Sequence, residues 1–290
     1  MKRLVIAIGL TLALIAILIP YESVLASPGP SNAPFIRIER SPASTNWSGY
    51  AEEAGGTTNG TLLGTVGNVS NATGSWTVPA VTGPSRGSYY SSAWVGIDGV
   101  TDNTVEQIGT EQDWSNGRAS YYAWFEMYPS MGYELNPSAF PVAAGDVMAA
   151  TVTCTNFSKG TFTLSLSDTR RGELKWSFSP TNYSQATQTL KSAEETSAEW
   201  VMEAPSSYSG VLPLADFSNI NFTTCSATIG GQLCAITTLP YDQITMETNS
   251  GVIKAIPSTV VPPASSFSVT YESSGAASNI SMPYQHVHIH

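Results

Sequence analysis

The nine residues YYAWFEMYP, Tyr121–Pro129, alternate two kinds of side chain. Successive side chains of a strand point to opposite faces, so Ala123, Phe125 and Met127 would share one apolar face. The other face would carry three aromatic residues and one acid: Tyr122, Trp124, Glu126 and Tyr128. This period of two predicts a strand with an apolar core face and a polar, aromatic outer face.

Similar alternating segments recur along the chain, separated by turns rich in Gly, Asn, Pro and Ser. They are GSWTVPAV, SSAWVGIDG, DVMAATVTCT, TFTLSLSDT, SAEWVMEA, INFTTCSATI and SFSVTYES. One segment, QATQTLKSAEETSAEW, could hold a helix, but its Thr and Ser content disfavours one. Many short strands in 290 residues predict an all-β fold, an antiparallel two-sheet β-sandwich.

The N-terminus has the pattern of a secretory signal peptide. Lys2 and Arg3 precede an apolar run from Leu4 to Ile19, and small residues follow up to Ala26. The alternative is an uncleaved anchor, although the run is near the short limit for a spanning helix. We expect four regions: a signal peptide over 1–26, a Pro- and Ser-rich leader or pro-segment over 27–44, one domain over 45–273 and a loose tail over 274–290.

Charge and histidine content exclude several classes of function. The net charge of -10 argues against a nucleic-acid partner, which would attract Lys and Arg. The three histidines, His286, His288 and His290, lie in the last five residues, so no Ser-His-Asp or Cys-His mechanism fits. No zinc motif or phosphate-binding glycine loop occurs. We therefore expect no metal and no organic cofactor, and working groups drawn from Glu, Asp, Gln, Asn, Tyr and Ser.

The three cysteines, Cys154, Cys225 and Cys234, cannot all pair within one chain. An oxidising compartment permits one disulfide, most simply between Cys225 and Cys234 across a hairpin. The alternative is three buried free thiols, and the sequence leaves both open.

Polar residues gather on one face of other strands as well. In SAEWVMEAP, Ser197–Pro205, the acids Glu199 and Glu203 share a face with Val201, opposite apolar residues. Two further segments also place polar residues on one face. In SAWVGIDG, Asp98 shares a face with the aromatic Trp94, and in TVEQIGTEQ, Gln107 shares a face with Glu111. The functional interpretation is a concave sheet face lined by Trp, Glu, Asp and Gln. The alternative is an ordinary solvated sheet face.

An acid on such a face has two main uses. A pair of carboxylates could cleave glycosidic bonds, but Glu199 and Glu203 lie roughly 13 Å apart along one strand, too far for a retaining pair. Glu126 would then have to supply the partner. Alternatively, one Glu activates water against an amide carbonyl while an amide side chain stabilises the oxyanion.

The motifs resemble those of the eqolisins, a family of secreted glutamic peptidases. STNWSGY, SAWVGIDG, TVEQIGTEQ, YYAWFEMYP and SAEWVMEAP stand in the family's order, followed by LADFSNINFT and FSVTY, over about Thr45 to Tyr271. The resemblance implies a sandwich of two seven-stranded antiparallel sheets with the site on a concave face.

The resemblance also implies roles for individual residues. Glu203 corresponds to the catalytic glutamate and Gln107 to the catalytic glutamine, whereas Glu199 is a neighbouring acid that we expect in or near water. Residues around the substrate cleft are implied at six positions: Trp47, Trp94, Asp98, Glu111, Trp124 and Glu126. The chain departs from the family at three positions: Glu111 for Asp, Met127 for Trp and Tyr122 for Asp.

These observations predict a secreted acid endopeptidase. Glu203 would act as general base and then acid, and Gln107 would stabilise the oxyanion from a neighbouring strand. We expect polypeptide substrates, no nucleic acid, a monomer, an acidic extracellular location and no stable membrane association after signal cleavage. The alternative is a carbohydrate-binding or glycoside-hydrolysing β-sandwich.

Overall fold

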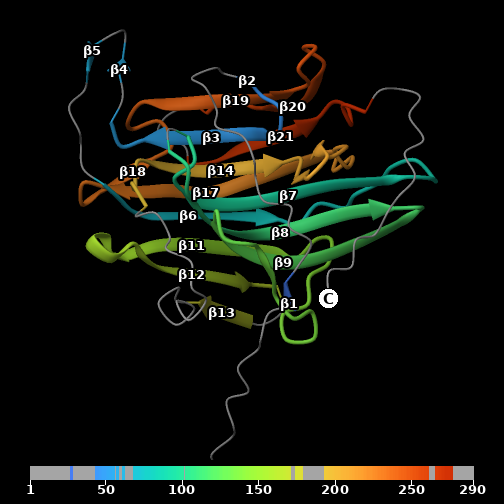
Figure 1. The fold of residues 1–290 in the computed structure, drawn as a ribbon, viewed down its shortest axis with the longest axis horizontal. Coiled ribbons are helices and arrows are strands. Elements are labelled where there is room, and N and C mark those ends of the chain that lie inside the picture. The colour runs from blue at the N-terminus through green and yellow to red at the C-terminus, as the bar shows by residue number, and fades with distance from the viewer. Residues whose placement is uncertain are drawn as a thin grey trace, which may run out of the picture.

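The computed structural model describes residues 27–28, 43–55, 57–58, 61–62, 68–100, 102–170, 174–178, 193–260 and 265–276. Over these residues the chain forms two layers of mostly antiparallel strands, and one 3-10 turn, η1 (Phe157–Lys159), is the only helical element (Figure 1). The predicted all-β sandwich is confirmed. The predicted signal peptide over 1–26 lies outside the described residues, as does most of the expected tail.

The first sheet, sheet A, carries the polar face described below. Its order is β1 (Ser27–Pro28), β10 (Tyr133–Glu134), β9 (Arg118–Tyr128), β8 (Val105–Ser115), β7 (Ser88–Ile97), β14 (Ser197–Glu203), β3 (Trp47–Glu53) and β19 (Tyr241–Glu247). All its pairs are antiparallel. Strand counts among the described residues differ slightly from the seven per sheet that the resemblance implied.

The second sheet, sheet B, packs behind the first. It runs β13 (Leu174–Phe178), β12 (Thr161–Asp168), β11 (Val147–Asn156), β6 (Val69–Thr77) and β17 (Asn219–Ile229). β17 pairs on its other side with β18 (Gln232–Ala235) and β21 (Phe267–Tyr271), and β20 (Ile253–Pro257), β19 and β2 (Ala43–Ser44) complete the sheet. Two small hairpins stand apart: β4 (Thr57–Thr58) with β5 (Thr61–Leu62), and β15 (Ser206–Ser207) with β16 (Gly210–Val211).

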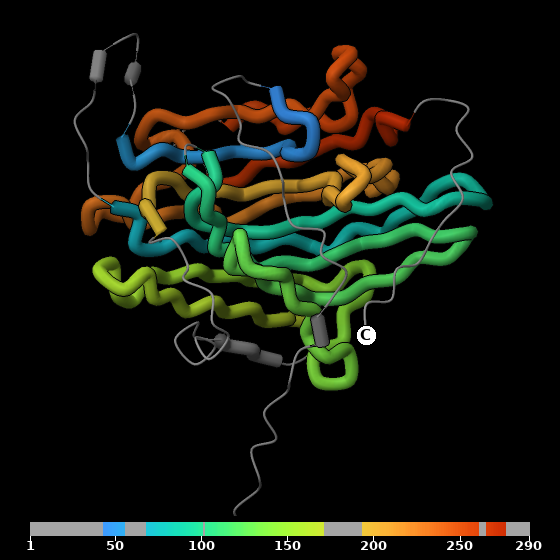
Figure 2. The backbone as a smooth tube through the Cα atoms, viewed as in Figure 1, coloured from blue at the N-terminus to red at the C-terminus, as the bar shows by residue number. Residues whose placement is uncertain are grey.

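Strand β19 joins the two sheets. Its first half pairs with β3 in sheet A, while its second half pairs with β2 and β20 in sheet B. The tube in Figure 2 follows this strand along the upper side of the view, beside β3. The shared strand matters for the site because it brings β20, from sheet B, close to the end of β3 and β14.

The core lies between the sheets, where the alternation of the sequence places it. Ala123, Phe125 and Met127 of β9 are buried there, as are Trp200 and Met202 of β14. The polar end of Trp200 is paired, since its indole Nε1 donates to the Thr73 carbonyl at 2.8 Å. The predicted core faces of both strands are therefore confirmed.

The three cysteines are free thiols, and all are buried. The structure therefore takes the second of the two alternatives, and no Cys225–Cys234 disulfide is present. Within the described part of the chain no helix is long and apolar enough to cross a membrane.

Candidate active site

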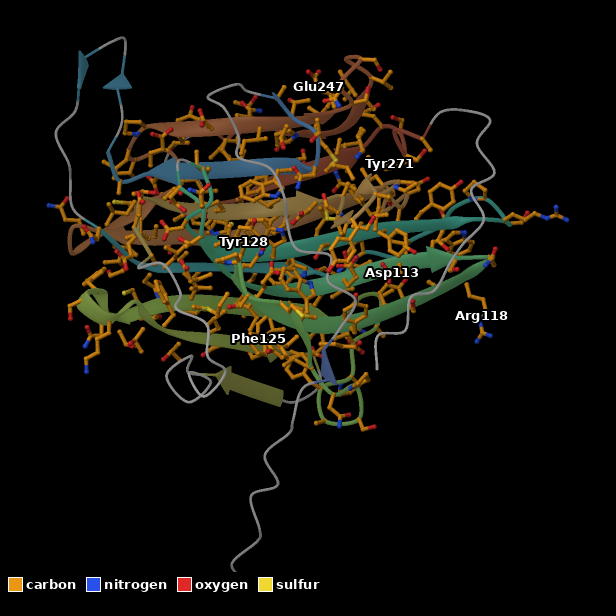
Figure 3. All side chains as sticks on the ribbon, in the orientation of Figure 1. Asp113, Arg118, Phe125, Tyr128, Glu247 and Tyr271 are labelled. Atoms are coloured by element: carbon orange, nitrogen blue, oxygen red, sulfur yellow. The ribbon has the colours of Figure 1, made fainter. Side chains whose placement is uncertain are left out.

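The outer face of sheet A carries a second buried cluster, separate from the core. It consists of Trp47, Ala51, Trp94, Val100, Val105, Val201 and Ile244, with Trp124 and Tyr128 packed against it. Val100 follows β7, and the others come from β3, β7, β8, β9, β14 and β19; Figure 3 labels Tyr128 of this cluster and Phe125 of the opposite, core face of β9. The aromatic outer face read from the sequence is therefore real, and it is buried rather than solvated.

The pairing register arranges the polar residues of this face in rows across the strands. One row joins Glu203 on β14 to Ser92 on β7 and Glu111 on β8. Another joins Gln107 on β8 to Glu126 on β9. Between them runs a row of mostly large apolar side chains: Val201, Trp94, Gly109 and Trp124.

The expectation that Gln107 and Glu203 lie on neighbouring strands is wrong. Strand β7 lies between β14 and β8, and the partner of Gln107 on β7 is Gly96, which faces Glu199 rather than Glu203. Alternation along a strand fixes the face of each side chain, but it contains no information on which strands are neighbours. Both residues do lie on the same face of one sheet, as a joint role requires.

Glu203 is held by hydrogen bonds to both carboxylate oxygens. Trp94 Nε1 donates to Oε2 at 2.7 Å, and Asn46 Nδ2 donates to Oε1 at 3.1 Å. Asn46 in turn accepts from the Ser44 hydroxyl at 3.1 Å, which fixes the amide with its N–H toward the carboxylate. Asn46 was not among the predicted site residues, although it directly precedes Trp47 in the motif STNWSGY.

Burial and hydrogen bonding act on the Glu203 carboxyl in opposite directions. The net pKa is about 8: burial raises it, and the bonds from Trp94 and Asn46, the nearby Trp47 indole and the Lys254 ammonium each offset part of that rise. Trp47 Nε1 has no hydrogen-bond partner of acceptable geometry, so its indole acts on the carboxyl by proximity alone. Glu203 is thus a carboxyl whose ionised form depends on its donors.

Gln107 and Glu126 form a second polar pair. Gln107 Nε2 donates to Glu126 Oε2 at 2.7 Å, and both side chains are buried. Burial raises the pKa of Glu126 well above its usual range, and the charge of Glu203 raises it further, whereas the Gln107 bond lowers it. Gln107 Oε1 and Glu126 Oε1 have no hydrogen-bond partner among the described residues, so each of these oxygens can still accept a hydrogen bond.

Glu111 lies on the same face, beside Asp113. Burial raises its pKa well above the usual value, and the charges of Asp113 and Glu203 add to this. A neutral carboxyl at this place agrees with the like charges around it.

The remaining predicted site residues divide into two groups, the three tryptophans and Asp98. Trp47 and Trp94 pack edge to face with ring centroids 4.9 Å apart, and Trp124 Nε1 donates to Ser92 Oγ at 2.9 Å. These three tryptophans therefore surround the Glu203 carboxylate or the row beside it.

Asp98 has a different environment. Its carboxylate accepts the backbone N–H groups of Glu194, Glu195 and Thr196 at 2.7 to 3.1 Å. It also adopts a φ of 73°, just after the end of β7. In the structure Asp98 therefore holds the segment that leads into β14, and it acts on Glu203 only through the placement of that strand.

The expectation that Glu199 lies in or near water is wrong. Its side chain is 0% exposed, and neither carboxylate oxygen has a hydrogen-bond partner among the described residues. Its neighbours across the strands are Ala51 and Gly96, which offer no polar side chain to the buried acid. Sequence alternation put Glu199 on the outer face correctly, but it could not show that this face is covered.

The comparisons with known proteins agree with this geometry. Residues 45–271 match the model of the peptidase A4 family. The chain belongs to the peptidase A4 family. The eqolisin resemblance read from the motifs is thereby confirmed over the range predicted for it.

Two curated relatives are similar to this A4 family member. Aspergillopepsin-2 of Aspergillus niger is 30% identical over 214 residues, which span 65% of the chain and 66% of that relative. Scytalidopepsin B of Scytalidium lignicola is 28% identical over 260 residues, 81% of the chain and 90% of the relative. The chain thus spans just under two thirds of the first relative's length.

Solved structures show the same fold. A scytalido-glutamic peptidase crystallised with a transition-state analogue inhibitor matches with a TM-score of 0.61 at 23% identity, over 79% of this chain and 98% of that one. Aspergilloglutamic peptidase from Aspergillus niger matches with a TM-score of 0.54 at 27% identity, over 63% and 99%. Among the described residues, no group of three His, Cys, Asp or Glu side chains could hold a metal ion.

Proposed function

We propose that this A4 family member is a secreted acid endopeptidase in which Glu203 and Gln107 carry out peptide hydrolysis. The observation that supports this most is the Glu203 carboxylate, buried on the outer face of sheet A with an N–H donor on each oxygen. Gln107 supplies an amide on the same face, and its Nε2 is oriented by Glu126.

In this mechanism the ionised Glu203 takes a proton from a bound water, and the water oxygen attacks the scissile carbonyl carbon. The Gln107 Nε2–H₂ group donates to the oxygen on which negative charge develops. The tetrahedral intermediate then collapses, the carbon–nitrogen bond breaks, and Glu203 returns its proton to the leaving nitrogen. Protons and electrons balance over one cycle without a metal or an organic cofactor.

The donors around Glu203 assign it the role of base. Among the three carboxyls that face one another here, Glu203 has N–H donors on both oxygens, whereas Glu111 and Glu126 each retain an oxygen without a partner. Environments that push the pKa values of neighbouring acids apart assign distinct roles to them. In the mechanism the bound water is a further donor to the Glu203 carboxylate, and it acts on the pKa in the same lowering direction as Trp94 and Asn46.

The proposal that the enzyme works at acidic pH is supported by the other buried carboxyl groups. Burial raises the pKa of Glu106, Glu199 and Asp98, so the folded chain favours their neutral forms. A protein with this preference is best suited to an acidic medium. We therefore propose extracellular secretion, acidic surroundings, polypeptide substrates and a monomeric state. The residues around the substrate would be Trp47, Trp94, Trp124, Glu111 and Glu126. Asp98 would act indirectly, through the placement of β14.

The test is proteolysis of a denatured protein in acid, with pepstatin and a chelator present. Cleavage under these conditions is expected for the wild-type chain, because neither a paired-aspartate site nor a metal is used. The same sample is assayed on a panel of polysaccharides. Sugar release without peptide cleavage would replace this proposal with the glycoside-hydrolysing alternative.

A further inference from the structure

Lys254 is a buried cation close to the proposed base. It lies on β20 and is 3% exposed, and it is the only Lys or Arg among the buried residues that the structure describes. An ammonium group taken out of water is unfavourable unless a partner compensates for the lost hydration. Its position therefore needs an explanation in terms of what it faces.

The segment from Glu272 to Gly275, near the C-terminal end of the described chain, packs against Lys254. The Lys254 carbonyl accepts the backbone N–H of Glu272 at 2.8 Å and that of Ser273 at 3.2 Å. A Cβ placed on Gly275 would lie 2.8 Å from Lys254 Cδ, so the backbone at Gly275 packs directly on the alkyl stem. The ammonium group can only be directed inward, away from this segment.

Its hydrogen bond leads toward the catalytic carboxylate. Lys254 Nζ donates to the Thr45 carbonyl at 3.2 Å. The next residue, Asn46, donates through Nδ2 to Glu203 Oε1 at 3.1 Å. The ammonium is thus separated from the Glu203 carboxylate by one backbone segment and one amide side chain.

We propose that Lys254 is a positioning residue for the Glu203 base: its buried charge favours the ionised form of this carboxyl, and its bond to the Thr45 carbonyl holds Asn46 against it. The proposal rests on the assignment of Glu203 as the base. The charge of each group shifts the pKa of the other in the direction that favours the ion pair.

The other groups that face Glu203 do not supply this charge. Glu126 on β9 and Glu111 on β8 are both acids, and burial raises the pKa of each well above its usual range. They are neutral in acid and therefore neither attract nor repel a proton on Glu203 there. Asn46 and Trp94 donate hydrogen bonds but carry no net charge. Lys254 is thus the one full positive charge that the described residues direct at the base.

The test replaces Lys254 and follows the ionisation of Glu203 in two ways. Lys254→Gln keeps a donor for the Thr45 carbonyl and removes the charge. The acidic limb of the kcat/KM profile should then move to higher pH by about one unit, as expected for loss of a unit charge at short range in a protein interior. Lys254→Arg keeps the charge and should restore the limb, and Lys159→Met, which removes an exposed lysine charge on η1, should leave it in place.

The second readout does not depend on catalysis. Trp94 Nε1–H is bonded to Glu203 Oε2, so its indole ¹H–¹⁵N resonance should titrate with this carboxyl. The midpoint should rise in Lys254→Gln and return in Lys254→Arg. If Lys254→Gln does not fold, Lys254→Met, which keeps an unbranched side chain and removes the charge, takes its place.

An unchanged titration midpoint in a folded, charge-free variant would overturn the role of Lys254, whatever the activity. Conversely, an active Glu203→Gln variant would overturn the proposed function and leave the charge coupling seen by NMR intact. The two failures are therefore distinguishable.

Discussion

Glu199 and Glu203 are identical side chains on one face of β14, and the structure gives them opposite surroundings. Glu203 has two N–H donors, whereas Glu199 has none among the described residues. Burial raises the pKa of Glu199 well above the usual value, and the charges of Asp98 and Asp102 raise it further. Glu199 is therefore neutral in acid, and Glu203 is the one of the two carboxyls whose ionised form has hydrogen-bond donors.

Replacing each acid with Gln separates these roles. Glu203→Gln should lose peptide cleavage at every pH, because an amide cannot accept a proton from water. Glu199→Gln exchanges one neutral group for another in acid and should keep most of the turnover, with a shift of the pH–rate curve of well under about one unit. The measurement is kcat/KM against pH for both variants. Equal loss in the two would mean that the carboxyls work together, as in a glycosidase.

Gln107→Ala removes the proposed oxyanion donor and leaves Glu126 without its amide partner. Loss of one such donor lowers kcat by about 100- to 1000-fold in comparable sites. We expect a loss of this size with an unchanged far-ultraviolet spectrum and thermal midpoint within a few degrees of wild type. A folded variant that retains full kcat would remove Gln107 from the mechanism.

At the scale of elements, strand β7 sets the geometry of the site. It separates β14 from β8, and its Trp94 supplies both the indole bond to Glu203 and the ring between the two polar rows. Trp94 faces Gly109 on β8, where a Cβ would lie 2.3 Å from the Ala93 carbonyl oxygen and 2.6 Å from Trp94 Cβ. Close approach of the two strands therefore requires glycine at 109.

Gly109→Ala tests this close approach. The added methyl group has to push β8 from β7 at Trp94, so we expect a lower thermal midpoint and a loss of cleavage larger than the stability change alone explains. The matched control is Gly231→Ala in the turn between β17 and β18, where a new Cβ meets nothing within 4 Å but the φ of +80° makes alanine strained, so stability falls without a contact to the site. Equal behaviour of the two variants would show that the Trp94–Gly109 contact does not position the site.

At the scale of the whole molecule, the buried acids couple folding to pH. Burial raises the pKa of Asp98 and of Asp113 to about 7, and that of Glu106 well above its usual range. Between the unfolded and folded pKa values the folded chain binds more protons than the unfolded chain. The stability from these groups is therefore fully present below about pH 4 and is lost as the pH rises through the folded values.

We expect the thermal midpoint to be highest in acid and to fall steadily toward neutral pH. Glu106→Gln cannot ionise and should make this fall shallower, whereas Glu272→Gln, an exposed acid, should not. Differential scanning calorimetry across this pH range measures both slopes. A midpoint that rises toward neutral pH would mean that these acids are ionised and stabilised in the folded chain.

The fold class, the core faces of the strands and the family could all be predicted from the amino-acid sequence. Alternation is a local property with a period of two, so it places Phe125 and Trp200 in the core whatever the neighbouring strands are. The resemblance to the eqolisin motifs implied the roles of Glu203 and Gln107, and the absence of histidine from the predicted domain agrees with a mechanism that uses an acid and an amide.

Which strands are neighbours and which charges lie close together depends on long-range packing and could not be predicted from the sequence. Strand order, the insertion of β7 between Gln107 and Glu203, and the dry surroundings of Glu199 follow from long-range pairing and burial. Lys254 is 51 residues from Glu203 in the sequence, and only the strand shared by the two sheets brings β20 behind the site. Electrostatic coupling depends on distance in space and on the exclusion of water, and neither is a property of local sequence.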